Sequence, residues 1–401
     1  MRARSSRRTR LKHTSASGYA LPVDAIDWGV AQRIGERIAG SPPYGGVRAA
    51  SVQPRAHDFA QRVAAYSGLP APAELPPLEA VDRPAWIAAN LSSMRPMLAP
   101  LSERMMIGPG ALPGPLRAVS GFLLGAQVGA LTGLLSQRVL GQYDLALLDP
   151  TAPSRLLLVA PNLALTARSL DVDRDELVLW VSIHEITHAV QFSAAPWLRD
   201  HLGGLLKELI DGLQVTLTGR LSPPGGERDR GPAPSGRSRG GRPRLPDPGD
   251  LLQLLDRARR GELLRMTLGE DRWQLVERVQ AAMSLIEGHA EHTMDAVGRE
   301  SLPSLPRLRA AMNRRRESRG LPWRVLERLL GLELKLRQYE TGRRFCDAVV
   351  HEAGPLALAD AWRSPAALPT PAELSEPLAW LARTGAGGSG AARTHVPPVT
   401  N

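Results

Sequence analysis

The segment DVDRDELVLWVSIHEITHAVQF, residues 171–192, limits the possible folds and functions of this chain more than any other. His184 and His188 are four residues apart, so on a helix both imidazoles lie on one face, one turn apart. Zn²⁺ favours nitrogen ligands, and two imidazoles placed in this way can bind the same ion. The residues around them are uncharged and mostly apolar, which indicates a buried helix and not a solvated surface helix: Val181, Ile183, Ile186, Ala189 and Val190.

Glu185 completes an HExxH motif. It lies about 100° around the helix from His184, so it borders the metal-binding face without blocking it. From there its carboxylate can accept a proton from a water molecule on the ion, as the glutamate of HExxH peptidases does. Asp173 is expected to be the N-cap of the helix, with Asp175 and Glu176 in the first turn.

The net positive charge of the chain would favour nucleic-acid binding, but the location of the charge argues against it. The 401 residues carry a formal net charge of +10, and 43% of them are hydrophobic, enough for one large domain or two lobes around a cleft. The excess positive charge lies in residues 2–12 and 222–246, which are poor in apolar residues and are expected to be disordered. Because the remainder is neutral and only 4% of residues are aromatic, specific nucleic-acid binding is not indicated.

The cysteine content and the N-terminus predict the cellular location. Cys346 is the only cysteine, which excludes an intrachain disulfide and a cysteine-based metal site. The basic first dozen residues run on into HTSASGYALPVDA, without the apolar segment of a secretory signal. Both features predict a cytoplasmic protein in a reducing environment.

The hydrophobic patterns predict a mainly α fold with a small β-sheet (α+β). We expect one domain over residues 21–383 with a disordered insertion at 222–248, a disordered basic tail at 1–20 and a flexible tail at 384–401. Pro- and Gly-rich connectors are expected at 41–54 and 68–78. Helical patterns occur, besides the HExxH segment, between the two connectors and at 24–40, 83–106, 118–137, 196–218, 251–266, 270–297, 321–350 and 371–383.

Two strand-like runs, QYDLALL (142–148) and RLLLVAPNL (155–163), directly precede the HExxH segment. They are expected to form a hairpin or adjacent strands. A sheet edge beside the metal-binding helix can hold an extended peptide substrate through backbone hydrogen bonds. The alternative is that the strands only pack against the helix, and the sequence does not separate the two.

Residues 118–137 contain no charged side chain and have glycine at every fourth position from Gly121 to Gly133. Such a stripe of small residues lets another helix approach closely, both in soluble cores and in membranes. Polar residues dilute the apolar run, and it is a single segment, so a buried helix of a soluble core is favoured over membrane insertion.

A second cluster of potential ligands lies in EGHAEHTMD, residues 287–295. On a helix, Glu287, Glu291 and Asp295 share one face. His289 and His292 lie about 200° and 140° around the helix from Glu287. Four or five such groups in so short a segment exceed what a solvated face needs, although charged helix faces are common.

Long motifs throughout residues 24–380 resemble one family. They include DWGVAQRIGERIAG, GAQVGALTGLLSQRVLGQYDLALL, HEITHAVQFSAAPWLRD, IEGHAEHTMDAVG and KLRQYETGRRF. The chain resembles the zincin-2 proteins, zinc metallopeptidases of gluzincin type that are often labelled coenzyme F-420 biosynthesis-associated. The resemblance implies a zincin-like fold and metal-dependent hydrolysis of a peptide or protein. The label reflects genomic association, and the insertion at 222–246 departs from the compact family pattern.

The resemblance also suggests the remaining site residues. Gln191 and Ala194 stand where the metzincin signature needs Gly and His, so the third ligand must come from elsewhere. EGHAEH is similar to the EGxA stretch of gluzincins, in which the Glu before Gly binds zinc. This implies Glu287 as the ligand and Glu291 as the acceptor for the outer N–H of a ligating imidazole. The alternative, in which Glu291 binds the metal and Glu287 only helps to solvate the helix, stays open.

The leading hypothesis is therefore a Zn²⁺-dependent peptidase with a water in the fourth metal position. His292 and Tyr339 are candidates for stabilising the oxyanion. Two alternatives remain: a non-catalytic zincin-fold binding or scaffold protein, and a membrane-associated protein that uses 118–137. The intact Glu185 counts against the first, because loss of the base is the simplest way to inactivate such a site.

Overall fold

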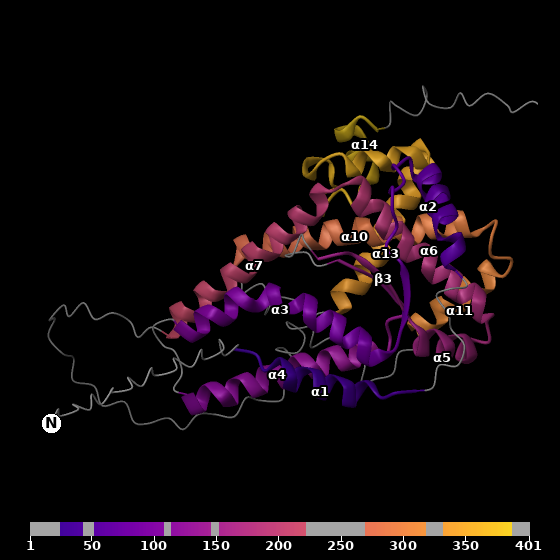
Figure 1. The fold of residues 1–401 in the computed structure, drawn as a ribbon. Helices are drawn as coiled ribbons and strands as arrows, with labels where there is room; N and C mark the ends of the chain where they lie inside the picture. Colours follow the sequence, from indigo (N-terminus) through magenta and orange to yellow (C-terminus); the bar gives the residue numbers. More distant parts are fainter. Residues whose placement is uncertain are drawn as a thin grey trace, which may run out of the picture.

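The structure, a computed structural model, describes residues 25–42, 52–107, 114–145, 152–221, 269–317 and 332–386. These residues form a mainly helical fold with one three-stranded sheet, which confirms the predicted fold class (Figure 1). The predicted tail 1–20, the insertion 222–248 and the helical pattern at 251–266 lie outside the described residues. Of the predicted tail 384–401, residues 384–386 are described, and Ala386 is fully buried.

The sheet has the strand order β1–β3–β2. β1 (Leu78–Val81) pairs parallel to β3 (Arg155–Val159), and β2 (Gly141–Asp144) pairs antiparallel to β3 on the other side. The central strand is buried on both faces, because alternate side chains enter two different hydrophobic cores. This double burial explains why the sequence of β3 is a continuous apolar run.

The predicted strands differ from the observed ones in length and number. The run at 155–163 ends as a strand at Val159, because α5 (Ala160–Leu170) begins there with Pro161 in its first turn, where no N–H is needed. The run at 142–148 contributes β2, and residues 146–151 lie outside the described part. β1 was not predicted; it falls at the end of the expected connector 68–78 and is too short to show a pattern.

One face of the sheet is covered by α1 (Trp28–Ala39) and α3 (Arg83–Ile107). α4 (Gly114–Ser136) lies beside α1 at the edge of the fold (Figure 1). A Cβ on Gly125 or Gly129 would overlap the backbone of α1 and its cap, so these glycines permit the contact. The glycine stripe is therefore explained by packing against α1.

The N-terminal half of α4 is more exposed than the predicted buried helix. Within the described residues, Ala118–Ser136 is the one helical segment long and apolar enough to cross a membrane, and 28% of that window is buried. Four large apolar side chains are more than half exposed: Leu116, Val119, Phe122 and Leu123. The prediction of a buried helix is wrong for this half, because α1 covers only the glycine face.

The larger core lies on the opposite face of the sheet and surrounds α6 (Arg174–Ala194). The predicted helices at 196–218 and 270–297 closely match α7 (Trp197–Leu221) and α10 (Glu270–Gly298). The helix expected at 321–350 is described from Leu332 onward, and the helix expected at 371–383 begins at Pro377 because turns precede it. The elements around α6 are α2 (Gln53–Ser67), α7 (Trp197–Leu221), α10 (Glu270–Gly298), α11 (Leu305–Glu317), α13 (Leu332–Ala353), η2 (Pro355–Trp362), η3 (Pro365–Ala367) and α14 (Pro377–Thr384).

Candidate metal centre

α6 brings the HExxH side chains to the inside of the fold. Asp173 caps its N-terminus as predicted: its carboxylate accepts a hydrogen bond of 2.8 Å from the backbone N–H of Glu176. Ile183 and Ile186 are fully buried in the larger core and fix the rotation of the helix. As a result Glu185 and His188 are buried, and His184 is partly exposed.

α10 crosses α6 and places Glu287 opposite the two histidines. The Nε2 atoms of His184 and His188 are 3.2 Å apart, and Oε2 of Glu287 lies 3.4 Å from the first and 3.6 Å from the second. Donor atoms bound to one zinc ion at about 2.0–2.1 Å with tetrahedral angles lie roughly 3.4 Å from one another. The chemistry and the separations of these three donors therefore fit a zinc ion and leave a fourth position free.

The position of Glu287 depends on a close crossing between α10 and α13. A Cβ on Gly288 would overlap the backbone of Gly342, and a Cβ on Gly342 would overlap the carbonyl of Ser284. Neither glycine can carry a side chain unless the two helices separate. The glycine of EGHAEH is therefore needed where α10 meets α13, directly after the candidate ligand.

Glu185 is held by the edge strand β2. Its Oε2 accepts a hydrogen bond of 2.7 Å from the backbone N–H of Tyr143, and a Cβ on Gly141 would lie 2.8 Å from its Oε1. Burial raises the pKa of Glu185 above its ordinary value, against the opposing influence of the two histidines and the Tyr143 N–H. A carboxylate with raised proton affinity is suited to accept a proton near neutral pH.

These contacts also bear on the expected strand edge for substrate. The outer edge of β2 faces α6, because the N–H of Tyr143 is donated to Glu185 and a Cβ on Gly141 would lie 2.7 Å from Val181. At these residues the strand packs against α6, as the packing alternative predicts. Substrate binding along this edge stays a prediction.

The carboxylate of Glu287 and the imidazoles of His184 and His188 shift one another's proton affinity. Burial lowers the pKa of His188, but the neighbouring carboxylate of Glu287 outweighs this and raises it to about 9. Burial raises the pKa of Glu287, but the imidazoles of His188 and His184 hold it well below its ordinary value. Glu287 is therefore ionised, and a cation bound between these side chains replaces a proton.

Gln191, and not Glu291, contacts the outer nitrogen of a candidate ligand. Gln191 Oε1 lies 2.9 Å from His188 Nδ1. Glu291 Oε1 accepts a hydrogen bond of 3.1 Å from Arg309. The expected position of Glu291 against an imidazole is wrong, because Glu291 lies one turn beyond Glu287, where α11 supplies Arg309. The sequence spacing could have predicted this contact, because Gln191 follows His188 by three residues on the same helix face.

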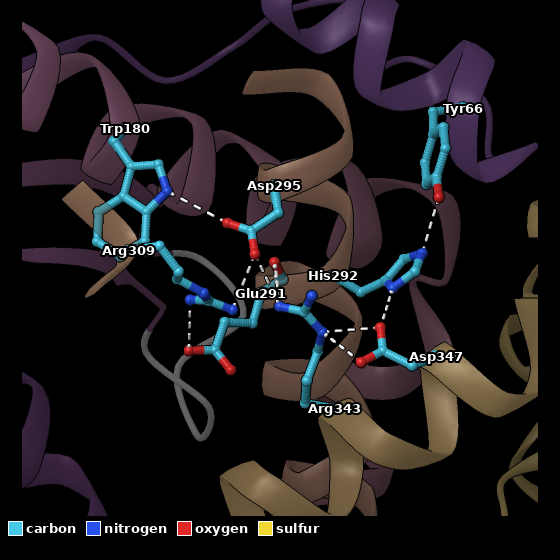
Figure 2. A network of polar contacts seen from close by, with 8 residues as sticks. All are labelled: Tyr66, Trp180, Glu291, His292, Asp295, Arg309, Arg343 and Asp347. Carbon is cyan, nitrogen blue, oxygen red and sulfur yellow. Dashed lines mark hydrogen bonds and ion pairs between the residues drawn. The ribbon is translucent and has the colours of Figure 1, made fainter. Parts of the chain in front are cut away.

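The other oxyanion candidates are placed differently. His292 belongs to a network of polar side chains (Figure 2): its Nε2 lies 2.7 Å from the Tyr66 hydroxyl and its Nδ1 lies 2.5 Å from Asp347. Both ring nitrogens are thus occupied, and the structure does not bring His292 to the candidate metal site. Tyr339 lies on α13, where the structure describes side chains from Glu340 onward, so its placement is outside the described side chains.

Comparison with known proteins gives two findings. Residues 26–381 match the family described as zincin-like metallopeptidases. Among solved structures, the chain is similar to a protein from Chloroflexus aurantiacus that is described as a candidate hydrolase with a novel fold. The identity is 28% and the TM-score 0.60, and the match covers 90% of this chain and 99% of that one. A search of curated proteins finds no significant match.

Proposed function

We propose that this chain, which belongs to the family of zincin-like metallopeptidases, hydrolyses peptide bonds at a zinc site formed by His184, His188 and Glu287. The observation that carries the proposal is the convergence of these three donors within 4.8 Å of one another, beside the buried carboxylate of Glu185. A bound zinc ion lowers the pKa of a coordinated water to about 7 and polarises a carbonyl group. The family implies a peptide or protein as the substrate class.

The remaining chemistry belongs to the side chains of this chain. Glu185 accepts the proton of the attacking water and delivers it to the leaving amine. The backbone N–H of Tyr143 holds the carboxylate at one oxygen, so the other oxygen is available for that proton. Burial supports the same function, because it raises the affinity of the carboxylate for a proton.

A non-catalytic scaffold is the weaker alternative. A buried carboxylate costs stability unless it is paired, and Glu185 accepts one backbone hydrogen bond of 2.7 Å. A protein that only bound a partner would gain nothing from this arrangement. The retained Glu185 therefore favours turnover.

Replacing Glu185 with Gln tests the proposal. The variant keeps the shape of the side chain and removes the base, so we expect zinc to be retained and peptide hydrolysis to fall by about 10²–10⁴-fold. Cleavage of a mixed peptide library, with and without a chelator, supplies the substrate for this measurement. Glu352→Gln, an exposed position at the end of α13, is the control with unchanged activity. Wild-type rates in Glu185→Gln would refute the mechanism.

A second candidate function is contact with a lipid surface through α4. It is favoured by the exposed apolar side chains of Leu116, Val119, Phe122 and Leu123. Spanning a bilayer would require α4 to leave α1, against which its glycines pack backbone to backbone. Surface contact predicts that the protein co-sediments with lipid vesicles, and that Phe122→Ser with Leu123→Ser reduces this binding. A wild-type protein that stays in the supernatant excludes the candidate.

A further inference from the structure

Gln191 is a fully buried polar side chain whose amide joins both helices of the candidate metal site. Its Oε1 lies 2.9 Å from Nδ1 of His188 on its own helix, α6. Its Nε2 lies 2.9 Å from the backbone carbonyl oxygen of Ile286 and 2.8 Å from Nδ1 of His289, both on α10. Ile286 directly precedes Glu287 in the sequence.

The carbonyl of Ile286 determines which way the amide points. A backbone carbonyl oxygen only accepts hydrogen bonds, so the NH₂ group of Gln191 must face it. The two amide hydrogens are then donated to Ile286 and His289, and Oε1 is left to accept from His188. The hydrogen therefore lies on Nδ1 of His188. Nε2 of His188 is the nitrogen that faces His184 and Glu287.

We propose that Gln191 is a positioning residue that sets the metal site from both sides at once. Through Oε1 it fixes the ring of His188 with Nε2 toward the ion. Through Nε2 it ties α6 to the backbone of α10 at the residue before Glu287, and so fixes the separation between the histidine pair and the carboxylate. A hydrogen bond of this kind to a metal-binding imidazole typically contributes 10–100-fold in metal affinity. The inference rests on the proposed zinc site.

A purely structural glutamine is the competing explanation. Such a residue would stabilise the crossing of α6 and α10 equally in the zinc-free and the zinc-bound protein. The two explanations differ in zinc affinity and in the state of the His188 ring, which a general loss of stability does not alter. The experiment therefore measures both.

The direct test replaces Gln191 with Met, which has a similar volume and no hydrogen-bonding amide. We expect the zinc dissociation constant, measured by competition with a chromophoric chelator, to rise by about 10–100-fold. Ser182→Ala is the matched control: Ser182 is also fully buried on α6, and its hydroxyl donates to the Val178 carbonyl at 2.7 Å, away from the ligands. The control should lose stability but keep zinc affinity within about twofold. Equal affinities in wild type and Gln191→Met overturn the proposal.

Gln191→Glu separates the two halves of the proposal. The carboxylate still accepts from His188 but sets an oxygen against the Ile286 carbonyl, so the connection to α10 is lost. An added negative charge near a cation would by itself strengthen binding. A weaker zinc affinity in this variant therefore supports the connection to α10, and an affinity equal to wild type or higher refutes it.

The ring of His188 provides a readout that needs neither activity nor metal. ¹⁵N-labelled wild-type protein should show an Nδ1–H resonance of His188 that exchanges slowly with solvent, both with zinc and without it, and Gln191→Met should lose it. If the wild-type protein binds no zinc but shows this resonance, the proposed function fails and the orientation of His188 by Gln191 stands. If zinc binds and the resonance is missing, the present inference fails alone.

Discussion

α10 carries acidic side chains in two opposite states, one at Glu287 and the other in the turns that follow it. At Glu287 the helix presents a carboxylate to His184 and His188, and the ion-pair partners of this carboxylate in the described structure are those two imidazoles. From Glu291 onward the helix carries the network of Figure 2, in which arginines neutralise the acids. There Arg343 lies 2.9 Å from Asp295 and 2.8 Å from Asp347, and Arg309 lies 2.9 Å from Asp295.

The comparison teaches how to distinguish a candidate metal site from an ion-pair network within one helix. A guanidinium is always protonated, so a carboxylate paired with arginine already has its counter-charge and gains little from a metal. An imidazole gives up its proton readily and then offers a lone pair. A cation can therefore replace the proton between Glu287 and the histidines, whereas it would have to displace an arginine at Asp295 or Glu291.

The largest expected effect comes from removing a ligand. We expect the wild-type protein to bind one zinc ion per chain. Most of this zinc should be lost in each of three variants, because each leaves only two protein donors: His184→Ala, His188→Ala and Glu287→Ala. Metal analysis of the purified variants measures this. His292→Ala changes a residue of the polar network on the same helix, and this variant should keep its zinc. Full occupancy in the His184→Ala and His188→Ala double variant would contradict the assignment.

The next largest effect is expected at the glycine crossing that supports Glu287. Gly288→Ala forces α10 away from α13, because the new Cβ overlaps the backbone of Gly342. We expect a loss of about 3 kcal/mol or more in the free energy of unfolding, with weaker zinc binding. Gly204→Ala is the control, because nothing lies within 4 Å of its Cβ and alanine favours a helix. Urea unfolding measures the free energy of unfolding of both variants. Equal values for Gly288→Ala and Gly204→Ala would show that α10 and α13 separate at no cost.

The smallest effects are expected in the polar network. Arg343→Met should cost about 2–3 kcal/mol of stability, because it leaves Asp347 and Asp295 each with one charged partner fewer, and zinc affinity should be unchanged. Asp347→Asn should cost about 1 kcal/mol or less, since Asp347 is half exposed. A zinc affinity that falls with either variant would show that the polar network and the candidate metal site are not independent.

The network also predicts a dependence on pH. Burial raises the pKa of Asp347, but its hydrogen bonds with His292 and Arg343 outweigh this and hold it below its ordinary value of 3.8. An acid with a depressed pKa in the folded state stabilises the fold above its ordinary pKa, and this contribution disappears as the pH falls below that value. Unfolding free energies at pH 7 and pH 3 should therefore differ less in Asp347→Asn than in the wild-type protein. Equal differences would exclude this contribution.

The sequence by itself determined the features that depend on local spacing. The interval between His184 and His188 places both on one helix face, and Asp173 begins that helix, because both relations are set within a few residues by helix geometry. The continuous apolar run of β3 and the long patterns of α7 and α10 are likewise local. The mainly helical fold with a small sheet followed from them.

Only the tertiary structure decided between residues that are equivalent on their own helix. Glu287 and Glu291 lie about 40° apart on one face, so helix phase does not separate them. The crossing of α10 over α6 brings Glu287 to the histidines, and Arg309 from α11 forms an ion pair with Glu291. Gln191 acquires its partners through the same crossing. Such contacts join residues about a hundred positions apart, and no local pattern encodes which of them meet.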